Sequence, residues 1–144
     1  MATSPYRTTV TIDGTSFEAV SADVAFETLK DRAGMPAMGS LSTSIRVWVD
    51  FHDDKNMPNS QMQKLFTMAN VVTRGKVKDM KIEFWKDDAH QDALCSYSFK
   101  GWISGFHTCN PLPAADGAGI NHLLELDLEP TLNTQNFKEI KLSN

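Results

Sequence analysis

The residues best suited to chemistry in this chain are a histidine and a cysteine, His107 and Cys109. They lie two residues apart, so on a strand they would share one face and could approach each other. A nucleophilic pair needs a third group to orient the base, and a metal centre needs three or four ligands. No such group lies near in the sequence, and no Gly-x-Ser-x-Gly turn occurs. The sequence therefore predicts neither a catalytic site nor a metal site.

Carboxylates and glycine loops give no stronger indication of chemistry. Paired carboxylates do the acid–base work of glycoside hydrolysis, but here they fall in polar turns or alternate with leucines along a strand, as solvated charges do. Gly34 and Gly39 have the spacing that opens a phosphate-binding loop, yet Ser40-Leu41 stands where Lys-Ser or Lys-Thr is required. We predict no enzyme activity and no cofactor. The carboxylate candidates are Asp53-Asp54, Asp87-Asp88 and the series Glu125, Asp127 and Glu129.

Length and composition indicate one ordinary domain. The chain has 144 residues, of which 41% are hydrophobic, and no run approaches the roughly 20 apolar residues of a transmembrane helix. Its formal net charge of −4 disfavours nucleic acid as a partner, and its basic residues are dispersed, with the densest run from Arg74 to Lys78. The N-terminus has neither the basic region nor the apolar run of a secretory signal. We expect Cys95 and Cys109 to be free, mostly buried thiols of a protein made in a reducing cytoplasm.

Alternating apolar and polar residues predict strands along almost the whole chain. Asp13-Gly14 fits a two-residue hairpin turn, and a break in the alternation at Ala19-Val20 predicts a bend. Gly101 and Gly105 suit a corner in a long aromatic strand. The predicted strands cover residues 6–12, 17–29, 41–52, 76–85, 93–109 and 120–129.

One short helix and one long loop interrupt these strands. Ser60 and Gln63 fit a capping box that begins a helix over residues 60–70. Residues 30–40 contain two glycines and a proline and are predicted to form a loop, although they also carry two methionines. The helix is expected to pack one apolar stripe into the core, made of Met62, Leu65, Phe66 and Ala69.

These elements predict a mainly β fold, an antiparallel barrel or sandwich with one flanking helix. We expect a single domain over residues 1–132 and a polar tail over residues 133–144. A barrel that binds a small ligand is one alternative, but the predicted strands are few and the helix interrupts them midway.

The order of elements resembles the haemolysin-coregulated protein family, which forms the tube of the bacterial type VI secretion system. The resemblance covers residues 6–132, and its best motifs are the Gly34-Met35-Pro36 loop and the strand end Phe84-Trp85-Lys86-x-Asp88. It implies two roughly orthogonal sheets closed into a barrel, and hexameric rings that stack into a tube. The tail from Asn133 departs from the family pattern. A tail-tube subunit of a phage-like particle is the nearest alternative.

The resemblance also implies binding partners and a cellular location. The subunit would contact its own copies, a surrounding sheath and a spike, and the tube would carry effector proteins in its lumen, with no catalysis. The protein would be made in the bacterial cytoplasm and then expelled folded by the machine, without a signal peptide. It would not insert into a membrane.

Three groups of residues are the candidates for these contacts. Residues 30–40 would join one ring to the next, unless the loop folds back on its own barrel. Two tryptophans on otherwise polar faces would anchor neighbouring subunits, unless they pack against the helix. Acidic strand faces would line either the lumen or the outer surface. The loop candidates are Arg32, Met35, Pro36, Met38 and Leu41; the lateral candidates are Trp48 and Trp102; the acidic candidates are Asp23, Glu27, Glu125, Asp127 and Glu129.

Overall fold

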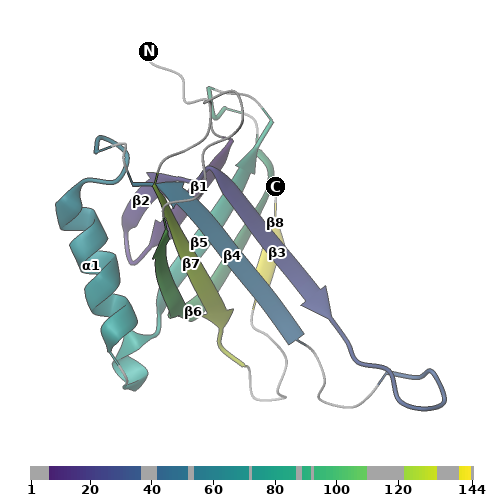
Figure 1. Ribbon diagram of the computed structural model, residues 1–144. Helices are drawn as coiled ribbons and strands as arrows, with labels where there is room; N and C mark the ends of the chain where they lie inside the picture. The colour runs from purple at the N-terminus through teal and green to yellow at the C-terminus, as the bar shows by residue number, and fades with distance from the viewer. Residues whose placement is uncertain are drawn as a thin grey trace, which may run out of the picture.

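Figure 1 shows the computed structural model, a mainly β fold with one α-helix in its described part. The structure describes residues 7–36, 42–51, 54–71, 73–86, 89–91, 93–109, 122–132 and 140–143. The predicted fold class is thus confirmed, and each predicted strand corresponds to at least one observed strand. The elements are β1 (Thr8–Ile12), β2 (Thr15–Glu18), β3 (Ser21–Glu27), β4 (Ser42–Asp50), α1 (Asn59–Asn70), a 3₁₀ helix (Arg74–Lys76), β5 (Lys78–Trp85), β6 (Ala93–Cys109), β7 (Leu123–Pro130) and β8 (Ile140–Ser143).

The strands form one antiparallel sheet in the order β2-β1-β5-β6-β7-β4-β3, with β8 paired to β6. Within the described residues this path is open, so the expectation of two sheets closed into a barrel is wrong. The reason is the predicted bend at Ala19-Val20, which divides the expected strand 17–29 into β2 and β3. Ala19 N–H donates to Thr8 O (2.9 Å) at one end of the path, and Val20 N–H donates to Trp48 O (2.8 Å) at the other.

The sheet folds over on itself along β6, which has 17 residues. Its first half pairs with β5, and from Gly101 onward it pairs with β7. A Cβ atom at Gly101 would lie 2.5 Å from the Glu129 carbonyl oxygen, so only glycine fits at this crossing. Figure 1 shows β3 and β4 crossing in front of β5 as a result. We call β3, β4, β7 and the second half of β6 the first layer, and β2, β1, β5, the first half of β6 and β8 the second layer.

The core lies between the two layers, on the inner side of each alternating strand. Every second residue of β1, β4 and β7 is buried, and each large apolar side chain there contributes about 1.5–3 kcal/mol. The outward residues of the same strands remain available for other contacts. The largest fully buried side chains include Ile12, Ile45, Met57, Leu65, Ile82, Ile103, Leu124, Leu126 and Leu128.

The hairpin between β1 and β2 follows its prediction. Asp13 and Gly14 both have positive φ values, 51° and 80°, as a two-residue turn of this type requires. The turn fixes the register in which Ile12 pairs with Thr15.

The helix differs from its prediction in two respects. It begins at Asn59 after Pro58, with no side-chain cap, so Ser60 lies inside the first turn and the predicted capping box is wrong. Leu65 and Met68 are its buried residues, whereas Phe66 is 47% exposed. The predicted stripe is therefore wrong at Phe66, because the helix turns Met68 toward the core instead. Among the described residues no helix is long and apolar enough to cross a membrane.

Strand β8 was not predicted from the sequence. It pairs with residues 96–99 of β6, and the Ser143 and Ser96 hydroxyl oxygens lie 3.0 Å apart. Its four residues alternate too briefly to stand out from a polar segment.

Candidate assembly surfaces

The segment after β3 projects from the molecule and has its own internal structure. Figure 1 shows it extending away from the sheet and curling at its tip. The Asp31 carboxylate accepts hydrogen bonds from the backbone N–H groups of Ala33 and Met35, both at 2.9 Å. Gly34 supplies the positive φ of 82° that the turn requires. The tip is therefore held in shape by hydrogen bonds within the segment, centred on the Asp31 carboxylate.

The tip presents apolar side chains to solvent. Met35 is 61% exposed, and Arg32 and Pro36 are exposed beside it. Leu29, at the base of the segment, is 68% exposed. Sequence reasoning did not select it, although its position at the end of a predicted strand could have indicated that it lies outside the core. The other two loop candidates, Met38 and Leu41, lie outside the described residues.

The acidic candidates all lie on one surface, the outer side of the first layer. Strand β4 runs between β3 and β7, so Arg46 pairs with Asp23 on one side and with Asp127 on the other. Arg46 Nε lies 3.5 Å from Asp127 Oδ1 and 3.8 Å from Glu125 Oε1. We call this surface the acidic face; its carboxylates are Asp23, Glu27, Glu125, Asp127 and Glu129.

A histidine also belongs to the acidic face. His107 Nε2 lies 3.6 Å from Asp127 Oδ2, so the carboxylate that the sequence did not place beside His107 comes from β7. A Cβ atom at Gly105 would lie 2.5 Å from the same Oδ2, which shows how closely Asp127 crosses β6. Cys109 is a free thiol, as is Cys95, but Cys109 is exposed, contrary to the expectation of burial. The reason is that Cys109 ends β6 on its outer side.

The two tryptophan candidates lie on the acidic face as well. Trp48 pairs with Glu125 on β7, and Trp102 pairs with Glu129. Both are half-buried, and neither belongs to the core or packs among its partly buried apolar neighbours. They are large aromatic groups set among carboxylates at opposite ends of β7.

The first layer has two edges with no partner strand in the described part of the chain. One is the edge of β3 away from β4, and the other is the edge of β6 away from β7 over residues 102–109. Helix α1 packs against β6. There Phe66 and Phe106 meet edge to face, with ring centroids 5.5 Å apart, beside an open groove of about 280 Å³. Sequence reasoning assigned Phe66 to the core and so missed this groove.

A polar cluster fixes the end of β2. Glu18 accepts hydrogen bonds from Thr9 (3.3 Å) and lies 3.5 Å from His90 Nδ1, while the His90 ring stacks on Trp85 at 5.2 Å. Burial raises the pKa of Glu18 above its ordinary value of 4.5, and the charge of Glu83 acts in the same direction. His90 and the Thr9 hydroxyl act in the opposite direction and lower the pKa.

Comparisons with known proteins agree with this geometry at the level of fold. No family model and no curated protein matches the sequence. The structure is similar to that of Hcp1 from Flavobacterium johnsoniae, with a TM-score of 0.63, 13% identity, and 95% of this chain and 94% of that chain covered. It is also similar to a chain of the PVC sheath–tube complex, an extracellular contractile injection system, with a TM-score of 0.60, 16% identity and coverage of 99% and 91%.

A third similar chain comes from the terminating cap of the anti-feeding prophage tube, with a TM-score of 0.57, 18% identity and coverage of 99% and 91%. All three likenesses extend over nearly the whole of this chain. The fold that the sequence resemblance implied is thus confirmed in its mainly β character and in the one α-helix of the described residues.

Proposed function

We propose that this chain is the structural subunit of a tube in a contractile injection machine, built from hexameric rings that stack. The observation that supports this most is the arrangement of the first layer. It has one water-facing acidic surface and two unpaired strand edges at its opposite sides. The similar folds of Hcp1 and of the sheath–tube complex chain support the same function.

Two different edges are what a closed ring of identical subunits requires. A ring needs a heterologous interface, in which one patch of a subunit meets a different patch of the next. The β3 edge and the edge of β6 over residues 102–109 would meet by main-chain pairing. Apolar side chains would support the contact, because Phe26 on β3 is 44% exposed and Phe66 borders the β6 edge. Pairing would also remove two edges that otherwise invite aggregation.

The acidic face would then line the lumen. In a ring joined along these edges, the first layers of successive subunits form one continuous wall. Its core-facing side is covered by the second layer, and we assign its other side to the central channel. A wet channel suits the five carboxylates of the acidic face, and Trp48 and Trp102 would lie at that wall near the subunit boundaries.

The projecting loop would join one ring to the next. Its tip is preorganised by Asp31, so little conformational entropy is lost when it docks. Burying Met35 and Leu29 against the next ring would contribute at most about 1.5–3 kcal/mol each. Six such contacts per ring, as the family resemblance implies, would hold a stack.

The partners and location follow from this role. The tube would contact a sheath, a spike and effector proteins carried in its lumen, and the subunit would be made in the bacterial cytoplasm before the machine expels it. The work of the subunit would be mechanical and not enzymatic. A subunit of a phage-like injection particle would have the same structure and differ in its sheath and spike.

Sedimentation of the purified protein, with negative-stain electron microscopy of the same sample, tests the proposal. We expect annular particles with six-fold symmetry and a mass six times the 16.0 kDa of the chain. A monomer that persists at high protein concentration would contradict the ring.

A further inference from the structure

We propose that the outer side of the second layer holds a binding site for an acidic peptide segment of a partner protein. The site is a cavity of about 410 Å³ whose lining includes three lysines from three strands, Lys81, Lys100 and Lys141. We call it the lysine pocket. It lies on the opposite side of the molecule's core from the acidic face, and neither the fold comparison nor the ring requires it.

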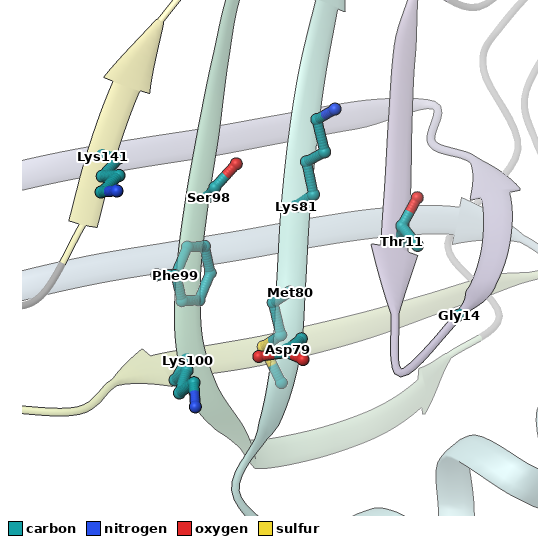
Figure 2. A pocket seen from close by; sticks show the side chains of 9 residues that line it. All are labelled: Thr11, Gly14, Asp79, Met80, Lys81, Ser98, Phe99, Lys100 and Lys141. Atoms are coloured by element: carbon teal, nitrogen blue, oxygen red, sulfur yellow. The ribbon is translucent and has the colours of Figure 1, made fainter.

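Strand register brings the pocket together. Thr11 pairs with Lys81, Lys81 with Ser98, and Ser98 with Lys141, so one row of outward side chains crosses β1, β5, β6 and β8. Figure 2 shows this row. Lys81 and Lys141 are two strand spacings apart, about 10 Å, and Lys100 lies two residues beyond Ser98, about 7 Å along β6.

The pocket has an excess of positive charge that neighbouring carboxylates neutralise only in part. Asp79 is the one carboxylate in its lining. Lys81 Nζ lies 3.6 Å from Glu83 Oε2. In the described part of the chain no ion pair is formed by Lys100 or Lys141. The charge of the pocket is therefore opposite in sign to the net charge of the chain, which is −4.

The spacing and chemistry of the pocket favour a peptide. An extended peptide places alternate side chains about 7 Å apart on one side, which matches the distance between the rows of Lys81 and Lys100. Ser98 adds a hydroxyl group between Lys81 and Lys141, while the Thr11 hydroxyl lies at the end of the row, 2.9 Å from the Ser16 hydroxyl. Carboxylates at two alternate residues would therefore meet the ammonium groups of the two rows.

Nucleic acid suits the pocket less well. Phe99, the one aromatic residue in the lining, is buried with its ring turned to the core, so no base could stack on it. The pocket offers lysines as point charges and no arginine fork for a phosphate. The acidic face and the net charge also repel a long polyanion.

In the assembled ring the pocket would face outward. This placement rests on the proposed function, because it follows from the acidic face lining the lumen. The partner would then be a protein that surrounds or approaches the ring from outside. Binding itself depends on the pocket alone and can be measured without a ring.

The probe is a fluorescein-labelled peptide with alternating residues, Gly-Glu-Ser-Glu-Ser-Glu-Gly, titrated with the full-length protein by fluorescence anisotropy at low and high salt. We expect saturable binding that weakens at high salt. Replacing both unpaired lysines, Lys100→Glu with Lys141→Glu, should weaken binding at least about tenfold. Lys100→Gln with Lys141→Gln should weaken it by about threefold.

Lys30→Glu with Lys86→Glu is the matched control, because it makes the same charge change at two exposed residues outside the pocket and should alter affinity by less than about twofold. Equal affinity for the double variants and the parent protein would overturn the proposal. Tighter binding of a single-stranded oligonucleotide of equal charge would also overturn it. Sedimentation of the parent protein keeps the two proposals separate, since an absence of rings together with saturable peptide binding would contradict only the ring.

Discussion

The two layers of the sheet use the same alternation of side chains for opposite charges. The acidic face of the first layer gathers five carboxylates around Arg46, whereas the lysine pocket of the second layer gathers three lysines around Asp79. In both layers the inward residues are apolar and buried. The contrast teaches that the core constrains only every second residue of a strand. The other residues are free to give each side of the molecule its own partner.

The contrast depends most on the joint between the layers. Gly101→Ala places a Cβ atom 2.5 Å from the Glu129 carbonyl oxygen and 3.1 Å from the Phe99 ring. Because backbone must move to relieve this contact, we expect a loss of about 2–3 kcal/mol in the free energy of unfolding, measured by urea denaturation. Gly75→Ala is the control, since its Cβ meets only Thr73 Oγ1 at 3.4 Å. Equal stability of both variants would show that the crossing of the layers is looser than described.

The two proposed edges can be tested without disturbing the second layer. In an antiparallel strand, successive N–H groups point to opposite edges, so one of Ala22 and Asp23 donates toward the unpaired edge of β3. We compare Ala22→Pro with Asp23→Pro. The variant that removes a bond to β4 should lose stability, while the other should stay folded but fail to form rings. Sedimentation and circular dichroism distinguish them. If both variants stay folded and still form intact rings, β3 is excluded as a subunit edge.

Stacking should respond to the projecting loop alone. Met35→Asp with Met38→Asp replaces the exposed Met35 and the second methionine of the predicted loop by charge. We expect rings to form normally, while tubes shorten or disappear in electron micrographs, because each docked methionine contributes at most about 3 kcal/mol. Met57→Leu, a conservative change in the core, serves as a control for methionine loss. Tubes of unchanged length would remove the loop from the interface.

The smallest effect is expected at the end of β2. The pKa of Glu18 is raised in the folded protein, so the folded state holds this proton more tightly than the unfolded chain does. The contribution of Glu18 to stability is therefore fully present below pH 4.5 and is lost as the pH rises through its folded pKa. Glu18→Gln should flatten this part of the stability profile by less than about 1 kcal/mol. Stability is measured by thermal denaturation at a series of pH values. Parallel pH profiles for the parent protein and the Glu18→Gln variant would contradict the role given to Glu18.

Local features of this fold could be predicted from the sequence. The bounds of β6, the Asp13-Gly14 turn and the bend at Ala19-Val20 follow from alternation and from glycine chemistry, which act over a few residues. The helix was predicted to within a residue at its start. Its buried side was not, because Met68 is turned inward by packing against the sheet and not by spacing alone.

Features that depend on strand order could not be predicted. Asp23 and Asp127 lie far apart in sequence and share a face only because β4 lies between their strands. The lysines of the pocket are dispersed in the sequence and come near one another only through strand pairing. Ser98 pairs with Lys81 on one side and with Lys141 on the other. The acidic residues that were chosen from alternation therefore lie on one face, whereas the lysine pocket and the groove beside Phe66 were not predicted.

The position of β8 has a consequence for synthesis on the ribosome. Strand β1 can pair with β5, and β4 with β7, only after the later strand of each pair has been synthesised. Lys141 belongs to β8, which follows all the other described strands in the sequence. Contacts this distant in sequence are slow to form. A nascent or truncated chain that lacks β8 therefore cannot present the complete lysine pocket, so the second layer displays its full charge only after residues 140–143 have been made and paired. Partner binding at that pocket would select subunits that carry β8 over fragments that lack it.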